Sequence, residues 1–276
     1  ASSETLAGSI SYNDPNYDFL GNSVFYSISS INNDKPNQGY ENALIVGRAS
    51  TSFEQYRNVD VQLGLSASHD DLRTQDTASA ALKKQKGTYN EITGDYGFTF
   101  DERNRTFMPT SGSIISFSQS LPFYADKSFI SNTLAASGYK SFGEDIVGAT
   151  KLYLSSIDGL SDDDVRLSKR LSISNKRLRG FERGKVGPVD GDDHVGGNHV
   201  AALNFEANLP NALPEDTNVD LSLFLDFANI WGVDYDPTIN DSYKLRSSTG
   251  VMANWMSPIG PMSFVFSQNL SKANTD

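Results

Sequence analysis

The basic segment KRLRGF at residues 176 to 181 is the part of this sequence whose residue types could do specific chemistry. It lies in the longest stretch without strand patterning, residues 158 to 199, and a loop of about forty residues usually has a function. Two acidic residues, Glu206 and Asp226, follow in the next two patterned segments. Because the planar guanidinium of arginine can bind two carboxylates at once, the loop could fold inward and bind both acids.

The same segment has a simpler interpretation as a surface turn in which Gly180 supplies a positive φ angle. A second cluster, His194 and His199 beside the acidic run at 190 to 193, has the residue types of a divalent-metal site. It has neither the spacing of a helical zinc site nor that of an EF-hand loop. We therefore expect a solvated loop there, with no metal and no cofactor.

Residue composition argues against several other classes of function. His69, His194 and His199 are the only histidines and all lie in or beside long loops, so we expect no Ser-His dyad and no enzyme activity. The chain has no cysteine, which excludes disulfides, cysteine-bound zinc and thiol chemistry. The 34 acidic residues exceed the 23 basic ones, and the net charge of -11 disfavours a nucleic-acid partner.

Alternation of apolar and polar residues is the strongest structural signal in the chain. Between residues 219 and 228 the odd positions carry Val, Leu and Phe, whereas the even positions carry Asp, Ser and Ala, with Phe224 as the exception. Several such segments reach the ~9–11 residues with which a tilted strand crosses a bilayer. About twelve occur, near residues 5–13, 20–31, 42–53, 59–68, 89–100, 112–122, 129–141, 146–157, 200–209, 219–230, 244–256 and 262–270.

The links between these segments alternate in length, which favours a membrane barrel over a soluble sandwich. Short links at 54–58 and 142–145 are interleaved with long ones at 32–41, 69–88 and 158–199. Outer-membrane barrels have short periplasmic turns and long outer loops, whereas a sandwich has no reason for such a difference. No stretch approaches the roughly 18 consecutive apolar residues of a transmembrane helix. The sequence thus predicts an all-β, transmembrane antiparallel β-barrel.

Six segments of the chain resemble the BamA family of outer-membrane assembly factors and its relatives in protein transport. The run RLRGF at 177–181 is similar to the family's loop motif of an aliphatic residue followed by Arg-Gly-Phe. The order and spacing of the six segments make the resemblance specific, and it spans nearly the whole chain. The other five are DPNYDFLG (14–21), DERNRTFMPTSG (101–112), GPVDGDDHVGGNHVAALNFEANLP (187–210), LFLDFANIW (223–231) and WMSPIGPMSF (255–264).

The resemblance implies a barrel of sixteen strands in the bacterial outer membrane, with a long loop folded into its lumen. Residues 5–13 resemble the fourth strand, so residues 1–276 form one barrel domain with about twelve strands. The first three strands, the last strand and the N-terminal periplasmic repeats then lie outside it. In the lumen, Arg179 contacts the carboxylates of Glu206 and Asp226. The loop motif consists of Leu178, Arg179, Gly180 and Phe181.

By the same resemblance, the expected function is to fold and insert β-barrel proteins into the outer membrane. The implied partners are nascent outer-membrane β-barrel proteins, lipoproteins of the assembly complex, outer-membrane lipid and lipopolysaccharide. A two-partner secretion pore or a related polypeptide transporter is the main alternative. A passive porin is a third, and it would have an open lumen, whereas an infolded loop predicts low conductance.

The distance between the two acids follows from the hairpin that joins their segments. A symmetric hairpin turning near residue 214 pairs Glu206 with Ser222, which leaves Asp226 four residues, or ~13 Å, further along the strand. One guanidinium then binds both carboxylates only if it lies between them.

Overall fold

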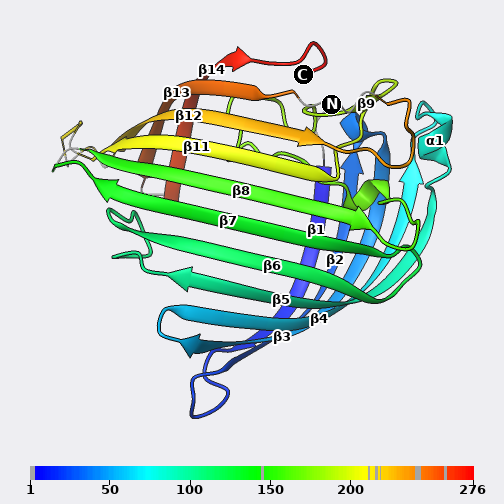
Figure 1. Cartoon of the computed structure of the whole chain (residues 1–276), viewed down its shortest axis with the longest axis horizontal. Coiled ribbons are helices and arrows are strands. Elements are labelled where there is room, and N and C mark those ends of the chain that lie inside the picture. The colour runs from blue at the N-terminus through cyan, green and yellow to red at the C-terminus, as the bar shows by residue number, and fades with distance from the viewer. Residues whose placement is uncertain are drawn as a thin grey trace.

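The computed structural model describes residues 4–143, 146–210, 212–214, 217, 219–239, 244–257 and 260–276. Twelve strands form one antiparallel sheet with the order β1-β2-β3-β4-β5-β6-β7-β8-β11-β12-β13-β14 (Figure 1). Each neighbour in this order is also the next long strand in the chain, so the sheet is a simple meander that curves around a lumen. The prediction of an all-β fold with about twelve long strands is confirmed.

The strands are 11 to 17 residues long, enough for a tilted strand to cross the ~30 Å hydrocarbon core of a bilayer. They are β1 (Glu4–Asp14), β2 (Ser23–Lys35), β3 (Tyr40–Tyr56), β4 (Val59–Thr74), β5 (Gly87–Asp101), β6 (Gly112–Ala125), β7 (Phe129–Ser141), β8 (Val147–Gly159), β11 (His199–Leu209), β12 (Val219–Trp231), β13 (Arg246–Ser257) and β14 (Gly260–Ser271).

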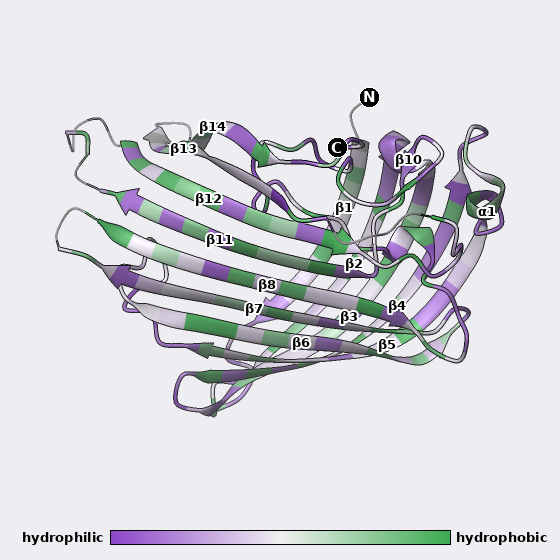
Figure 2. Cartoon of the chain, turned by 45° about the horizontal axis from the view of Figure 1, so that its top comes forward, coloured by the Kyte–Doolittle hydropathy of each residue, from purple (hydrophilic) through white to green (hydrophobic). Residues whose placement is uncertain are grey.

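The outward faces of the strands are apolar and the inward faces are polar. Ile10, Ile28 and Leu65 point outward with 83%, 67% and 53% of their surface exposed, whereas Asn204 and Asp226 on the inner face are buried. Figure 2 shows the resulting bands of hydrophobic and hydrophilic residues along β8, β11 and β12. A soluble protein hides its apolar face, so this arrangement is the one expected of a wall that contacts lipid.

Connections at the two ends of the strands differ, as the alternating links predict. At one end the turn between β3 and β4 is only residues 57–58, while the other end carries residues 75–86 with α1 (Ala80–Lys83) and residues 160–198 (Figure 1). The predicted long link at 32–41 is wrong, because β2 and β3 run on until only η1 (Pro36–Gln38) and Gly39 separate them. No helix in the described part of the chain is long and apolar enough to cross a membrane.

The connection of residues 160–198 folds back into the lumen. It contains η2 (Leu167–Lys169) and a small separate sheet of β9 (Val189–Asp190) and β10 (Asp193–His194). An apolar cluster joins the connection to the inner wall. Leu178, Phe181 and Val186 of the connection pack in this cluster against Val200 and Ile230 of the wall. The connection, called the lumen loop below, is therefore a packed element and not a free surface segment.

Orientation in the membrane gives the first testable prediction. We expect the end with the long connections to face outward from the cell. In the full-length protein, a cysteine replacing the exposed Asp164 of the lumen loop should react with a membrane-impermeant maleimide on whole cells. A cysteine replacing the exposed Arg57 of the β3–β4 turn should react only after permeabilisation. Labelling of both in detergent is the control, and the reverse pattern on whole cells would show that the assignment is inverted.

Candidate functional site in the lumen

Arg179 of the lumen loop is bound by Asp226 on the inner face of β12. Its Nε donates to Asp226 Oδ2 at 2.7 Å and its Nη2 donates to Oδ1 at 2.5 Å, a bidentate pair. The backbone N–H of Arg179 also donates to Oδ2, at 3.1 Å. Both side chains are buried, at 6% and 0% exposure. Charge-assisted hydrogen bonds in this bidentate geometry hold the loop tip at a defined position and pair the charge of Arg179 with that of Asp226.

The second carboxylate of the expected set binds the remaining edge of the same guanidinium. Glu206 Oε1 lies 3.0 Å from Arg179 Nη1, and its other oxygen, Oε2, accepts from Lys151 Nζ at 2.6 Å. The structure therefore brings Arg179, Glu206 and Asp226 together, and adds Lys151 of β8. Two carboxylates and two cations form a charge-balanced chain across β8, β11 and β12.

The register of the β11–β12 hairpin explains how one guanidinium reaches both acids. Glu206 pairs with Phe224 and Asn204 pairs with Asp226, so the acids are offset by two residues, or ~7 Å, and not four. The expected pairing of Glu206 with Ser222 is wrong. Side chains alternate with a period of two, so a shift of two residues leaves every side chain on the same face and alternation cannot detect it.

Neutral side chains complete the contacts of Arg179. The guanidinium carbon lies 3.8 Å from the centre of the Phe224 ring, a cation-π contact. Asn204 donates from one amide nitrogen to Asp226 Oδ1 at 2.7 Å and to the carbonyl of Arg177 at 2.8 Å. Phe224 thus interrupts the polar face of β12 because it supports Arg179.

Gly180 lets the loop tip approach the wall closely. Its φ angle is +85°, and a Cβ there would lie 2.6 Å from the Ser267 hydroxyl and 2.7 Å from Asn269 Oδ1, both on β14. Leu178 and Phe181 on either side are buried, at 1% and 7% exposure. Each motif residue therefore has its own role. Leu178 and Phe181 pack in the apolar cluster, Arg179 binds the two carboxylates, and Gly180 permits the turn.

A second buried arginine of the lumen loop binds another part of the wall. Arg166 donates from Nε to Asp70 Oδ2 of β4 at 3.3 Å and from Nη2 to Glu91 Oε2 of β5 at 3.1 Å. Its side chain is 2% exposed, and Ser168 and Lys169 bind the same two carboxylates. The guanidinium also lies over the rings of Tyr89 and Phe129, at 5.1 and 5.4 Å. This arrangement repeats the Arg179 site, with one arginine between acids on adjacent strands.

A third arginine ties the lumen loop to the connection between β12 and β13. Arg170 is bound to Asp234 and lies 4.7 Å from the centre of the Tyr235 ring. Burial alone raises the pKa of Asp234, but the charge of Arg170 and the N–H groups of Val165 and Asn198 outweigh burial and leave that pKa below its usual range. The loop is thus fastened to β4–β5, to β11–β12 and to a neighbouring loop.

The sequence signal for these additional anchors is the basic run RLSKR at 166–170, which lies in the same loop as KRLRGF. Nothing local to it identifies Asp70 or Glu91 as its partners, since they precede it by many residues in the chain. The histidine and acidic cluster is not the solvated loop that we expected, because Asp193 and His194 are buried, at 7% and 9% exposure, and line a hollow together with Gly180 and Phe181. His199 Nε2 is 3.7 Å from Asp158, and within the described ranges no group of three or more metal-ligating side chains occurs.

Comparison with known proteins identifies the family. The whole chain, residues 1–276, matches the Omp85 superfamily domain. It is similar to the outer membrane protein assembly factor BamA of Neorickettsia risticii, at 28% identity over 246 residues that cover 87% of this chain and 33% of the relative. The chain therefore spans about a third of that relative's length.

Solved structures show the same fold. BamA of Haemophilus ducreyi lacking POTRA domains 1-3 superposes with a TM-score of 0.85 at 24% identity, covering 99% of this chain and 60% of that one. CdiB of Acinetobacter baumannii superposes with a TM-score of 0.63 at 13% identity, covering 99% and 48%. The chain belongs to the Omp85 superfamily and is an outer-membrane β-barrel domain of the BamA type.

Proposed function

We propose that this domain is the membrane part of an insertase that folds β-barrel proteins and inserts them into the bacterial outer membrane. The relatives named as outer-membrane protein assembly factors support this proposal. Within the domain, the observation that carries it is the lumen loop, fastened to the inner wall by Arg179. A barrel used as a passive pore needs an open lumen, whereas here a packed loop occupies it.

The chemistry of insertion is strand pairing and forms no covalent bond. In hydrocarbon each unpaired backbone group costs several kcal/mol, so an incoming strand gains most by pairing its N–H and C=O groups with an existing sheet edge. A rigid inner wall, held by the loop, would keep such an edge in register while a client strand adds to it.

This proposal defines the expected partners by their chemistry. The clients are unfolded polypeptides whose strands alternate apolar and polar residues, as the strands of this domain do. Lipid surrounds the exposed apolar side chains of the wall, such as Ile10 and Phe266. Assembly lipoproteins and lipopolysaccharide complete the proposed set, and no nucleic acid, cofactor or catalytic residue is included.

A secretion pore of the same superfamily is the second candidate. The two functions differ in where the client polypeptide ends. An insertase leaves its client in the bilayer, whereas a secretion pore delivers the polypeptide to the far side of the membrane.

Reconstitution of the full-length protein in liposomes separates these functions. We expect it to raise the rate at which a urea-unfolded eight-stranded outer-membrane barrel becomes folded and membrane-embedded, measured by heat-dependent gel migration, above that of empty liposomes. Because the lumen loop fills the pore, single-channel conductance should stay low. Client found soluble inside the liposomes would indicate secretion instead, and high steady conductance without insertion would indicate a porin.

A further inference from the structure

A hollow of about 260 Å³ lies inside the lumen, at the end of the wall that carries the short turns. Its lining comes from the inner faces of β7, β8, β11, β12 and β13 and from the turn between β5 and β6. Three lining residues, Lys151, Glu206 and Met252, also belong to the Arg179 site. Lys151 binds Glu206, and Met252 Sδ lies 4.0 Å from Arg179 Nη1. The hollow therefore lies directly beside the contact that holds the lumen loop.

The turn between β5 and β6 has a fixed shape in which Met108 lines the hollow. Asn104 Oδ1 accepts from the backbone N–H of Thr110 at 3.1 Å, and the Asn104 amide donates to the Thr110 hydroxyl at 2.8 Å. Arg105 Nε donates to the carbonyl of Met108 at 2.6 Å. Met108 itself has a φ of +48°, which is uncommon for a residue with a side chain, and it is 43% exposed. A strained backbone that presents an exposed apolar side chain is typical of a ligand contact.

Most of the polar side chains in the lining already have partners. Ser222 donates to Asn208 Oδ1 at 2.7 Å, and Ser263 donates to Asn254 Oδ1 at 2.7 Å. A ligand therefore meets mainly the apolar part of the lining, in which methionine side chains can adapt to apolar groups of different shape. This apolar part consists of Met108, Pro109, Tyr139, Val147 and Met252.

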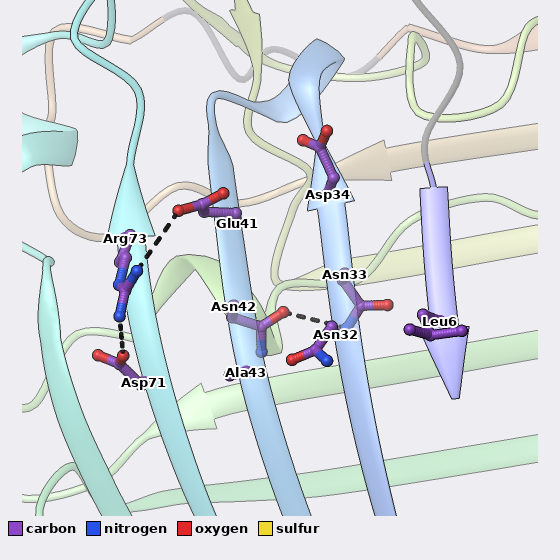
Figure 3. Close-up of a pocket in the computed structure, with 9 residues that line it drawn as sticks. All are labelled: Leu6, Asn32, Asn33, Asp34, Glu41, Asn42, Ala43, Asp71 and Arg73. Carbon is purple, nitrogen blue, oxygen red and sulfur yellow. Dashed lines mark hydrogen bonds and ion pairs between the residues drawn. The ribbon is translucent and has the colours of Figure 1, made fainter. Parts of the chain in front are cut away.

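A second hollow, near the opposite ends of β2, β3 and β4, has a different chemistry (Figure 3). It has a volume of about 350 Å³ and is lined by Glu41, Asp71 and Arg73. Arg73 lies 2.9 Å from Asp71 and 4.0 Å from Glu41, and the side chains of Arg73 and Glu41 are 60% and 58% exposed. Charged groups with this exposure stay hydrated, so an apolar group would gain little by displacing their water. Of the two, the hollow beside Arg179 is the one suited to an apolar ligand.

The size of the hollow beside Arg179 fits one large side chain together with the backbone that carries it. A cavity of about 150 Å³ holds a benzene molecule. The hollow, at about 260 Å³, has room for an aromatic ring and the adjoining peptide group. In the expected orientation this end of the barrel faces the periplasm, which is the side from which an unfolded client reaches the outer membrane.

We propose that this hollow binds a large apolar side chain, such as phenylalanine, of an unfolded client polypeptide. The side chain packs against Met108 and Met252, and the adjoining backbone extends toward the periplasm. Affinity comes from apolar surface removed from water, so the size of the side chain matters more than the sequence around it. The inference rests on the proposed insertase function and names one place where the client contacts the lumen, beside the contact between Arg179 and Glu206.

Binding of synthetic peptides to the full-length protein in lipid nanodiscs tests the site. A short fluorescent peptide of polar residues with one central phenylalanine is compared, by fluorescence anisotropy, with the same peptide carrying serine at the centre. We expect the phenylalanine peptide to bind at least about tenfold more tightly, because only its ring fills the hollow. Empty nanodiscs correct for binding to lipid. Equal affinity of the two peptides would overturn the proposal.

Met108→Gly removes part of the apolar lining and leaves the shape of the turn, because glycine adopts a φ of +48° without strain. It should weaken binding of the phenylalanine peptide about fivefold and leave the serine peptide unchanged. Phe107→Ala is the matched control, since Phe107 lies in the same turn and is 66% exposed but does not line the hollow. It should bind both peptides as the wild type does. Equal effects of the two variants, each checked for folding by heat-dependent gel migration, would overturn the assignment to the hollow.

Disulfide trapping locates the bound peptide. Thr110→Cys, in the lining, should cross-link to a cysteine placed next to the phenylalanine of the peptide, whereas Arg57→Cys, at the same end of the barrel but outside the hollow, should not. Cross-linking at Arg57→Cys alone, or tighter binding of laurate than of the phenylalanine peptide, would overturn the assignment to a client. Client insertion into liposomes without a preference for the phenylalanine peptide would refute this site and leave the proposed function standing. A preference that depends on Met108, without client insertion, would support the site and refute the function.

Discussion

Arg179→Ala in the full-length protein should abolish most assembly activity and lower the temperature at which the barrel unfolds in heat-dependent gel migration. Asp226 has no exposed surface and the Glu206 side chain is 7% exposed, so the change leaves two carboxylates in the lumen with one lysine. Removing one member of a buried ion pair typically costs ~3–5 kcal/mol of stability. Arg179→Lys should recover part of the charge but not the bidentate bonds to Asp226.

Lys176→Ala is the matched control for this change, because Lys176 lies in the same basic segment but is exposed. It should leave assembly activity near that of the wild type and change the free energy of unfolding by no more than about 0.5 kcal/mol, as a surface substitution does. Arg179→Met combined with Asp226→Asn separates stability from function. Removing the buried acid as well as the arginine should restore part of the melting temperature, while activity stays low if the position of the loop tip is what assembly requires. Normal assembly by Arg179→Ala would show that the contact is dispensable.

Alternation predicts most of the strands because the inner and outer faces of this wall meet different surroundings. It fails where that difference ends. At the tip of the β2–β3 hairpin both faces carry polar residues: Asn33 on the inner face bonds to Asn42, and Glu41 on the outer face is exposed. The ladder continues there without any contrast of polarity, so the sequence predicts these strands too short and the link between them too long.

Phe224 shows that an exception in the pattern can mark a functional contact. An apolar ring on the polar face of β12 is unexpected from alternation, and the structure places it under the guanidinium of Arg179. Local rules are most often broken at functional sites, so this single mismatch carried information about the site. Alternation holds no information about the pairing register, because a shift of two residues leaves every side chain on the same face.

The residue types in the loop do not show which distant residues its arginines bind. Glu206 and Asp226 follow the loop directly and fall on the polar faces of the next two strands, which brings them into consideration. Glu91 also falls on an expected strand, whereas Asp70 falls in the expected link at 69–88, and nothing in the sequence connects either acid to Arg166. Only the curvature of the wall around the lumen places β4 and β5 beside the loop.

Arg166→Ala in the full-length protein should destabilise the barrel by an amount similar to Arg179→Ala, ~3–5 kcal/mol. The change strands Asp70 and Glu91, which are 1% and 5% exposed, with Lys169 as the only remaining cation among their described contacts. Arg73→Ala provides the comparison within the same wall. That arginine is 60% exposed and pairs with Asp71, so its removal should cost no more than ~1 kcal/mol. Equal melting of the two variants would show that the Arg166 contact carries no stability.

The combination of Arg166→Ala with Arg179→Ala tests whether the loop acts as a strut across the lumen. Arg166 binds β4–β5 and Arg179 binds β11–β12, and three strands, β6, β7 and β8, separate these pairs in the sheet order. A loop released at one end holds the other end less firmly, so the double variant should lose less stability than the two single changes together, by about 0.5–3 kcal/mol. Strict additivity would mean that the anchors act independently. Proteolysis within the lumen loop should rise in either single variant, because freeing one anchor exposes a segment that is buried only while both hold.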